Sequence, residues 1–237
     1  MTLKWLSSYA PVDEEFDNVS LLLHGDGTNG STTIVDSSSS PKAVTAVGDA
    51  QISTAIADPF GNTTGVIALD GSGDYLATPD SEDFYLPGDF TIEGWVYSTA
   101  SSFGAIVAQW RDQGGSDRNF SLSVDGLFYM NRAGTNQSVS LGAFSLNQWT
   151  YFAVAVENGT CYGFINGVLQ DSNSNFTAAA NNSTEPLGIG GYGNGDFVFS
   201  GYIDDFRITK GVARYTANFT PPTAPFPDLS PTTRLTA

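Results

Sequence analysis

Short runs of alternating apolar and polar residues, separated by glycine-rich turns, dominate this chain. In the run 90–97, Ile92 and Val96 fall on one face and Thr91 and Glu93 on the opposite face. A period of two residues is typical of a β-strand that buries one face. The run therefore predicts a strand with Ile92 and Val96 turned toward a core.

Several of these runs flank turn residues and predict hairpins. The long apolar run 148–156 is followed by a turn and a returning run 161–165, and Asn166-Gly167 then leads into 168–170. An Asn-Gly pair between apolar runs is the strongest short-range hairpin signal. Further hairpins are predicted for 120–124 with 127–131, and for 66–69 with 74–77 around the turn 70–73.

About ten to twelve short strands, spaced 8–12 residues apart with turns between them, predict an all-β, antiparallel sandwich of the jelly-roll kind. We expect an N-terminal arm at 1–16, the sandwich at 17–226 and a tail at 227–237. Apolar residues in the arm indicate that it docks on a neighbouring subunit or on its own domain. These residues are Trp5, Leu6, Tyr9 and Phe16.

The segment 201–211 predicts a strand with a carboxylate on an apolar face. Strict alternation puts Asp204 on the same side as Phe206 and Ile208, with Asp205 and Arg207 opposite. An acid on an apolar face is costly unless hydrogen bonds or a cation compensate it. The segment therefore indicates a fixed structural site, with a metal ion as one interpretation.

Charge and composition exclude several functions. Nine Lys and Arg against 25 Asp and Glu give a formal net charge of -16, which disfavours nucleic-acid binding. Solubility in a salty medium and discrete cation sites are both open explanations of this charge. Cys161 and His24 are the only residues of their kinds, so a disulfide, a zinc cluster of several histidines and a serine-hydrolase triad are not expected. We also expect no signal peptide at the N-terminus and no membrane insertion.

Four segments together resemble the laminin-G-like domains of the concanavalin A-like lectin/glucanase superfamily. They are 21–27, 90–96, 149–168 and 199–208, the last of which contains Gly201-Tyr202-Ile203-Asp204-Asp205-Phe206-Arg207-Ile208. The resemblance implies the sandwich fold, but the fold hosts lectins, hydrolases and inert structural modules alike. The ending 209–222 is similar to laminin-G-like modules of bacteriophage virion proteins, which include those of cyanobacterial phages.

The resemblance also implies a structural calcium ion between the first strand's turn and the closing strand. The matching positions are Asp26, with turn carbonyls beside it, and Asp204. Carboxylates and carbonyls supply the oxygen ligands that calcium needs. The alternative is that Asp204 accepts hydrogen bonds from backbone N–H groups.

The residues argue against a glycosidase and leave glycan binding open. Glu93 has no acidic partner two or four residues away, as a retaining carboxylate pair would need. The loops 111–119 and 190–196 combine aromatic, acidic and amide side chains, which suit sugar recognition. The candidate ligand-binding residues are Trp110, Arg111, Asp117, Asn119, Tyr192, Asn194 and Asp196. Alternatively, Trp110 and Tyr192 are core residues.

The sequence is best interpreted as a non-enzymatic structural or decoration protein of a phage virion, on capsid or tail. Its expected partners are other virion subunits and cell-surface glycans, and its oligomeric state is left open. The alternative is a free carbohydrate-binding module of a secreted or cell-surface protein.

Overall fold

Fifteen strands and two short 3₁₀ helices make up the part of the chain that the computed structural model describes, namely residues 11–101, 103–111 and 117–231. The helices are η1 (Phe16–Asn18) and η2 (Glu82–Phe84). The strands are β1 (Val19–Leu23), β2 (Thr45–Val47), β3 (Gln51–Ser53), β4 (Val66–Asp70), β5 (Tyr75–Thr78), β6 (Phe90–Ser98), β7 (Ala105–Trp110), β8 (Arg118–Ser123), β9 (Leu127–Arg132), β10 (Thr135–Ser140), β11 (Trp149–Glu157), β12 (Thr160–Ile165), β13 (Val168–Asn173), β14 (Leu187–Ile189) and β15 (Ser200–Lys210).

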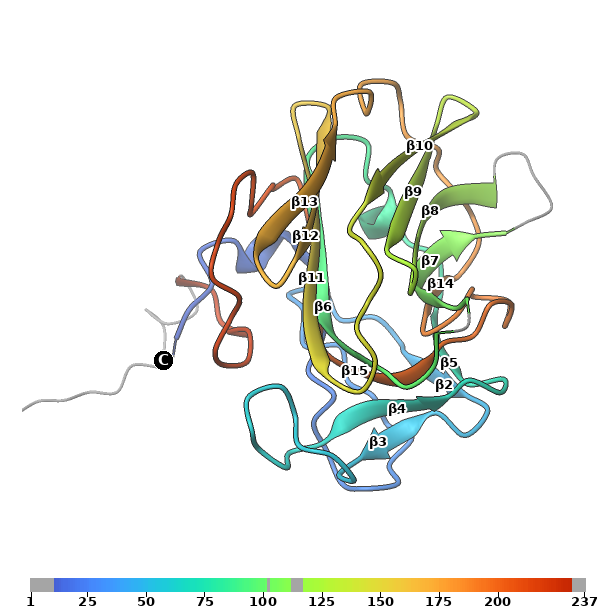
Figure 1. Ribbon diagram of the computed structural model, residues 1–237, viewed down its shortest axis with the longest axis vertical. Coiled ribbons are helices and arrows are strands. Elements are labelled where there is room, and N and C mark those ends of the chain that lie inside the picture. The colour runs from blue at the N-terminus through green and yellow to red at the C-terminus, as the bar shows by residue number, and fades with distance from the viewer. Residues whose placement is uncertain (1–10, 102, 112–116, 232–237) are drawn as a thin grey trace, which may run out of the picture.

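The strands form two antiparallel sheets that face each other (Figure 1). Sheet A has the order β13-β12-β11-β6-β15-β4-β3, with β1 also paired to β15. Sheet B has the order β10-β9-β8-β7-β14-β5-β2. The predicted antiparallel sandwich is confirmed, and so are the β11–β12–β13 meander and the β8–β9 hairpin.

One apolar core fills the space between the two sheets. Ile92 and Val96 lie in it, as their alternation predicts, and Phe128 packs there with its ring centroid 6.4 Å from that of Phe120 and 6.5 Å from that of Phe176. Burying a side chain of this size stabilises the fold by roughly 1.5–3 kcal/mol. Cys161 is a buried free thiol in the same core.

The predicted hairpin around 70–73 is wrong. Strand β4 pairs with β3 and β15 in sheet A, whereas β5 pairs with β2 and β14 in sheet B. The turn therefore carries the chain from one sheet to the other, and Leu69 and Leu76 enter the core from opposite sides. In the sequence, a hairpin turn and a turn that connects two sheets both appear as a glycine-rich segment between two alternating runs. Only the long-range pairing of the strands distinguishes the two.

The alternation expected in 201–211 is also wrong, because β15 contains a bulge. The register with β6 shifts between Asp204 and Arg207, and Asp205 has a φ of +46°. A bulge adds one residue and reverses the side to which later side chains point. Ile203 and Phe206 consequently share the inter-sheet core, while Asp204 does not belong to that core.

Both terminal segments, as far as the structure describes them, pack on the outer face of sheet A (Figure 1). We call residues 212–230 the C-terminal strap. Phe226 of the strap and Phe16 of the arm are buried in a second apolar cluster with Tyr151. The Asp13 N–H donates to the Leu229 carbonyl at 2.9 Å, so the two segments lie side by side. The predicted arm residues Trp5, Leu6 and Tyr9 and the last residues of the predicted tail, 232–237, lie outside the described residues.

A buried network of charged groups lies beneath the strap. Glu93 is fully buried, and its Oε1 accepts two hydrogen bonds from Arg207, at 2.9 and 2.7 Å. Its Oε2 accepts a hydrogen bond from the Tyr151 hydroxyl. Asp13 accepts from Arg207 at 2.8 Å and from Arg214 at 2.7 Å. The network ties the arm and the strap to sheet A.

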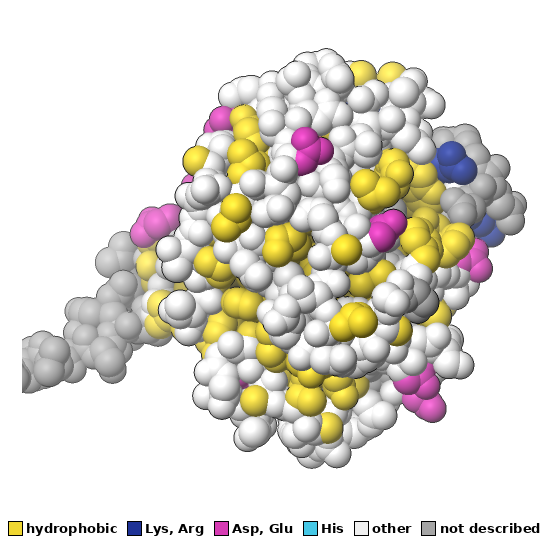
Figure 2. Space-filling model, viewed as in Figure 1, with side chains coloured by type: hydrophobic (Ala, Val, Ile, Leu, Met, Phe, Trp, Pro, Cys, Tyr) yellow, Lys and Arg dark blue, Asp and Glu magenta, His cyan; other side chains and the backbone are white. Residues whose placement is uncertain are grey.

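The surface agrees with the acidic composition. On the face shown in Figure 2, apolar side chains are scattered among polar ones, acidic groups occur at several places and basic groups only at one margin. Among the described residues, no helix is long and apolar enough to cross a membrane.

Candidate functional site

Three turns meet at one end of the sandwich and form what we call the loop rim. They are 70–74 between β4 and β5, 98–104 between β6 and β7, and 190–200 between β14 and β15. The Thr99 N–H donates to the Ser200 carbonyl at 3.1 Å, so two of these turns are joined through their backbones. The rim is therefore built from segments far apart in the sequence, and residue 102 within it lies outside the described residues.

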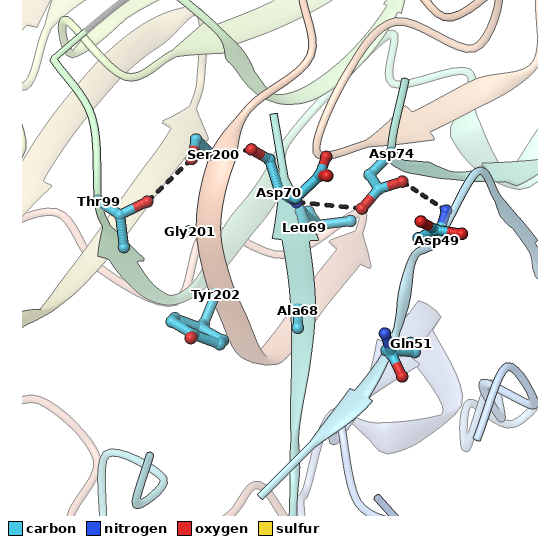
Figure 3. Close-up of a pocket in the computed structure, with 10 residues that line it drawn as sticks. All are labelled: Asp49, Gln51, Ala68, Leu69, Asp70, Asp74, Thr99, Ser200, Gly201 and Tyr202. Atoms are coloured by element: carbon cyan, nitrogen blue, oxygen red, sulfur yellow. Dashed lines mark hydrogen bonds between the residues drawn. The ribbon is translucent and has the colours of Figure 1, made fainter. Parts of the chain in front are cut away.

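Beside the rim, on the outer face of sheet A, lies an open hollow with a volume of about 330 Å³ (Figure 3). Asp74 is buried at its side, where its Oδ1 accepts from the Asp49 N–H and its Oδ2 accepts from the Asp70 N–H at 3.1 Å. Asp49 and Asp70 themselves are exposed. The lining residues are Asp49, Gln51, Ala68, Leu69, Asp70, Asp74, Thr99, Ser200, Gly201 and Tyr202.

The lining has the chemistry of a site for a polyhydroxylated ligand. Carboxylate and amide oxygens accept hydrogen bonds from hydroxyl groups, and Asp49, Asp70 and Gln51 supply them. The ring of Tyr202 adds an apolar surface and is itself held edge-on against Tyr97, with the ring centroids 5.8 Å apart. None of the lining residues is basic, so a negatively charged ligand is disfavoured.

The structure brings Trp110 and Tyr192 together, but it buries both. They are 6% and 5% exposed and pack with Ala105 and Ala108 in a small cluster separate from the inter-sheet core. Asn119 is fully buried, and its amide donates to the Phe84 carbonyl at 3.0 Å and to Gln109 Oε1 at 2.7 Å.

The ligand role predicted for Trp110, Tyr192 and Asn119 therefore needs correction. A sugar stacks on a ring face that reaches solvent, and tight packing in a small apolar cluster leaves these rings only a few per cent exposed. The burial of Trp110 and Tyr192 agrees with the alternative that they are core residues, and the sequence did not decide between the two because their cluster forms between β7 and the turn after β14.

The other predicted ligand residues lie near the surface. Arg111 forms an ion pair with Glu185 at 3.0 Å, and the Asp117 carbonyl accepts from the Arg111 N–H at 3.0 Å. Asn194 and Asp196 are exposed on the loop rim, where the Asn194 amide donates to Asp196 Oδ2 at 2.7 Å. A ligand role for these four residues stays a prediction, and residues 112–116 of the first loop lie outside the described residues.

Sequence reasoning missed two exposed aromatic residues on the same rim. Phe103 is 51% exposed and Phe197 is 39% exposed, and their rings meet edge-to-face with centroids 5.2 Å apart. We call these two residues the aromatic pair. The sequence signals only Phe103, which stands between Ser and Gly residues, because Phe197 begins the apolar run Phe197-Val198-Phe199.

Of the residues predicted to hold calcium, Asp204 lies within β15, next to the turn at Gly25 that leads into the exposed Asp26. Asp204 is 3% exposed, and its Oδ1 has no hydrogen-bond partner among the described residues. Burial, together with the negative charges of Asp205, Asp26 and Asp58, raises the pKa of the Asp204 carboxyl to about 9. A cation beside this oxygen would offset all of these costs.

Two further observations bear on a cation at Asp204. Gly25 has a φ of +74°, and a Cβ there would lie 2.6 Å from Asp204 Oδ1, so the turn approaches the carboxylate as only glycine permits. Within the described ranges, however, no cluster of three or more His, Cys, Asp or Glu residues is arranged to hold a metal ion. Any ion would therefore depend on backbone carbonyls for most of its ligands.

The only histidine anchors the C-terminal strap. His24 Nδ1 lies 2.7 Å from Asp205 Oδ1, and Asp205 Oδ2 accepts from the Phe226 N–H at 2.8 Å. Burial would lower the pKa of His24, but the hydrogen bond and charge of Asp205 outweigh burial and raise it. His24 is thus engaged in holding Asp205 and the strap.

The two facing sheets define a lectin-like β-sandwich. The family model of the concanavalin A-like lectin/glucanases superfamily, of the laminin-G-like kind, matches residues 70–214, more than half of the chain. The protein belongs to this superfamily. A search of curated proteins found no match to the sequence.

Solved structures show the same fold at low sequence identity. The binding domain of Paraclostridial Mosquitocidal Protein 1 is 19% identical with a TM-score of 0.62, over 82% of this chain and 49% of that one. The ligand-binding domain of botulinum neurotoxin serotype D, in complex with N-acetylneuraminic acid, is 16% identical with a TM-score of 0.61, over 83% and 48%. Domain 4 of AbnA, an extracellular arabinanase from Geobacillus stearothermophilus, in complex with arabinotriose, is 20% identical with a TM-score of 0.59, over 83% and 94%. The chain thus spans about half of the toxin domains and nearly all of the arabinanase domain.

Proposed function

We propose that this protein is a non-catalytic carbohydrate-binding module whose ligand site is the loop rim with the hollow beside it. The observation that carries this proposal is the open hollow of Figure 3, in which exposed carboxylates, an amide and a tyrosine ring converge on one ligand-sized space. Sugars need hydrogen-bond acceptors for their hydroxyl groups and an apolar surface for their ring faces. The binding domains of similar fold, one with arabinotriose and one with N-acetylneuraminic acid, support a sugar ligand for this chain.

Burial of Glu93 supports the non-catalytic part of the proposal. This carboxylate lies beneath the C-terminal strap, bonded to Arg207 and Tyr151, where no substrate reaches it. A glycosidase needs an exposed pair of carboxyl groups on either side of the bond it cleaves. In the hollow, Asp74 and Asp70 each accept hydrogen bonds from backbone N–H groups, which suits fixed acceptors in a binding site.

A glycan array tests the binding function. The purified protein is expected to bind at least one neutral oligosaccharide with micromolar affinity, and Asp49→Asn is expected to weaken that binding about tenfold, or ~1.4 kcal/mol. Glu14→Asn removes the same charge from an exposed residue of the arm and serves as the control. Absence of binding across neutral, amino and acidic glycans would refute the proposal.

We further propose that the module is displayed on a bacteriophage particle, bound to capsid or tail subunits, with a free secreted or cell-surface module as the alternative. The segment 209–222, which resembles phage virion modules, supports this placement. The described ends of the chain also lie side by side, at the left of Figure 1, whereas β4 ends toward the loop rim at the lower right. Anchoring at one side would leave the rim facing outward.

Immuno-electron microscopy of the source particles tests the virion placement. An antibody against the purified protein is expected to label intact particles at a repeated position. Label confined to the particle-free supernatant would favour the secreted alternative.

We also propose that Asp204 and Asp26 bind a structural calcium ion together with turn carbonyls, and the unpaired Asp204 Oδ1 is the observation that favours it. At a calcium concentration of 100 Kd, binding stabilises the fold by ~2.7 kcal/mol, so EDTA is expected to lower Tm by roughly 5–10 °C. In Asp204→Asn this dependence on EDTA is expected to disappear. A wild-type Tm that EDTA leaves unchanged would refute the calcium proposal.

A further inference from the structure

We propose that the aromatic pair, Phe103 and Phe197, is a stacking subsite that binds the apolar face of a neutral sugar ring. The inference rests on the proposed carbohydrate-binding function and extends its site beyond the hollow. It names two residues that determine specificity and one class of ligand, an uncharged oligosaccharide.

The exposure of the pair is the first observation. Large aromatic side chains are normally buried, and two of them are exposed here in contact with each other, with an interplanar angle of 85°. The perpendicular rings offer a face and an edge to the same space. Such a corner suits the C–H groups on one side of a sugar ring, which pack against aromatic faces.

The backbone at Phe197 is the second observation. Its φ of +53° is a strained conformation for a bulky residue, and such strain concentrates at functional sites. The conformation is held by its surroundings, because the Phe197 carbonyl accepts from the Ala105 N–H at 2.7 Å and the ring packs on Tyr192 with centroids 4.8 Å apart. The fold therefore keeps this ring at the surface at an energetic cost.

The tightly packed turns around the pair make it rigid. A Cβ on Gly104 would lie 2.7 Å from the Val198 carbonyl oxygen, so the two turns approach each other as closely as their backbones allow. The Tyr192 N–H donates to the Asp196 carbonyl at 2.8 Å and closes the second turn. A preformed aromatic surface loses little entropy when a ligand stacks on it.

The pair and the hollow lie on different sides of the sandwich and are joined by two segments of chain: Phe197 packs on Tyr192 over sheet B, whereas Tyr202 in the hollow lies on the outer face of sheet A. Phe103 follows Thr99 by four residues and Phe197 precedes Ser200 by three, and Thr99 and Ser200 both line the hollow. Such stretches span at most roughly 10–14 Å. The aromatic pair is therefore a separate subsite, which an oligosaccharide can occupy without entering the hollow.

The charge of the surroundings selects an uncharged ligand. The carboxylate of Asp196 directly precedes Phe197, and carboxylates give the chain a formal net charge of -16. A sialylated or uronic-acid glycan would bring like charge to these carboxylates, which costs affinity. The hydroxyl groups of a neutral sugar can instead donate hydrogen bonds to these carboxylates.

Matched variants on one glycan array test the inference. The array carries neutral oligosaccharides, including cellotetraose, chitotetraose and arabinotriose, beside sialylated counterparts. Phe103→Ala and Phe197→Leu are expected to weaken binding of the neutral glycans at least tenfold, whereas Phe197→Tyr, which keeps an aromatic face, is expected to stay within about twofold of wild type. Leu146→Ala changes an exposed apolar residue outside the rim turns and is the control.

The outcomes separate this inference from the proposed function. If wild type binds neutral glycans and both Phe103→Ala and Phe197→Leu bind them equally well, the stacking subsite is refuted while the carbohydrate-binding function stands. If wild type binds sialylated glycans as tightly as neutral ones, the ligand class is refuted. If wild type binds no glycan, both proposals fall. Equal Tm values confirm that the variants are folded, and Phe103→Ala decides the question if Phe197→Leu is unfolded.

Discussion

Replacing Arg207 with leucine is expected to lower the free energy of unfolding by about 3–5 kcal/mol. The Arg207 guanidinium donates to both Glu93 and Asp13, and all three side chains are less than a tenth exposed. Its loss would leave the fully buried Glu93 carboxylate without its closest cation. Denaturant unfolding followed by tryptophan fluorescence measures the change.

Two further variants test whether this loss of stability comes from leaving a buried charge unpaired. Arg111→Leu removes an arginine whose side chain is 41% exposed in its pair with Glu185, and it should change stability by less than about 1 kcal/mol. The double variant Glu93→Leu with Arg207→Leu should recover part of the loss, because no buried charge is then unpaired. If Arg207→Leu costs no more than Arg111→Leu, the buried network does not hold the fold together.

Phe226→Ala is expected to cost about 3–5 kcal/mol, the range for truncating a buried phenylalanine. Phe226 is 6% exposed, and the Arg207 guanidinium lies 3.7 Å from the centre of its ring. Its N–H also donates to Asp205. The expected result is a lower denaturant midpoint together with faster proteolytic cleavage of the strap.

The control for this variant is Val168→Ala, which truncates a half-exposed apolar side chain at the edge of sheet A and should cost little. Wild-type stability of Phe226→Ala would mean that the C-terminal strap is an independent tail. A large loss would mean that the strap completes the domain, so that a partner on a particle must bind other surfaces or the terminal residues beyond it.

Much of the fold follows from local pattern. The strand β6, the β8–β9 hairpin and the β11–β12–β13 meander were predicted because alternation and Asn-Gly turns act between neighbours in sequence. The β4–β5 connection and the bulge at Asp205 were not, because both depend on partners distant in sequence. Short strands such as β2 and β3 carry too few residues to show a period.

The candidate site was predicted less well, for the same reason. The loops at Asn194 and Asp196 were identified from their composition, and they do lie on the rim. The hollow was not identified, because its lining joins β3, β4, β15 and the turn at Thr99. Trp110, a candidate ligand residue, is buried, whereas Phe197, for which no role was predicted, is exposed.

The sequence by itself determined the sandwich class, because side-chain alternation and turn chemistry are local properties that can be recognised in each strand separately. Only the tertiary structure decided which charges are buried together and which aromatic rings reach solvent. Burial depends on what covers a side chain, and the C-terminal strap covers both Glu93 and Arg207. The strap begins more than a hundred residues after Glu93 but only a few residues after Arg207, so local sequence cannot show that the two are buried together.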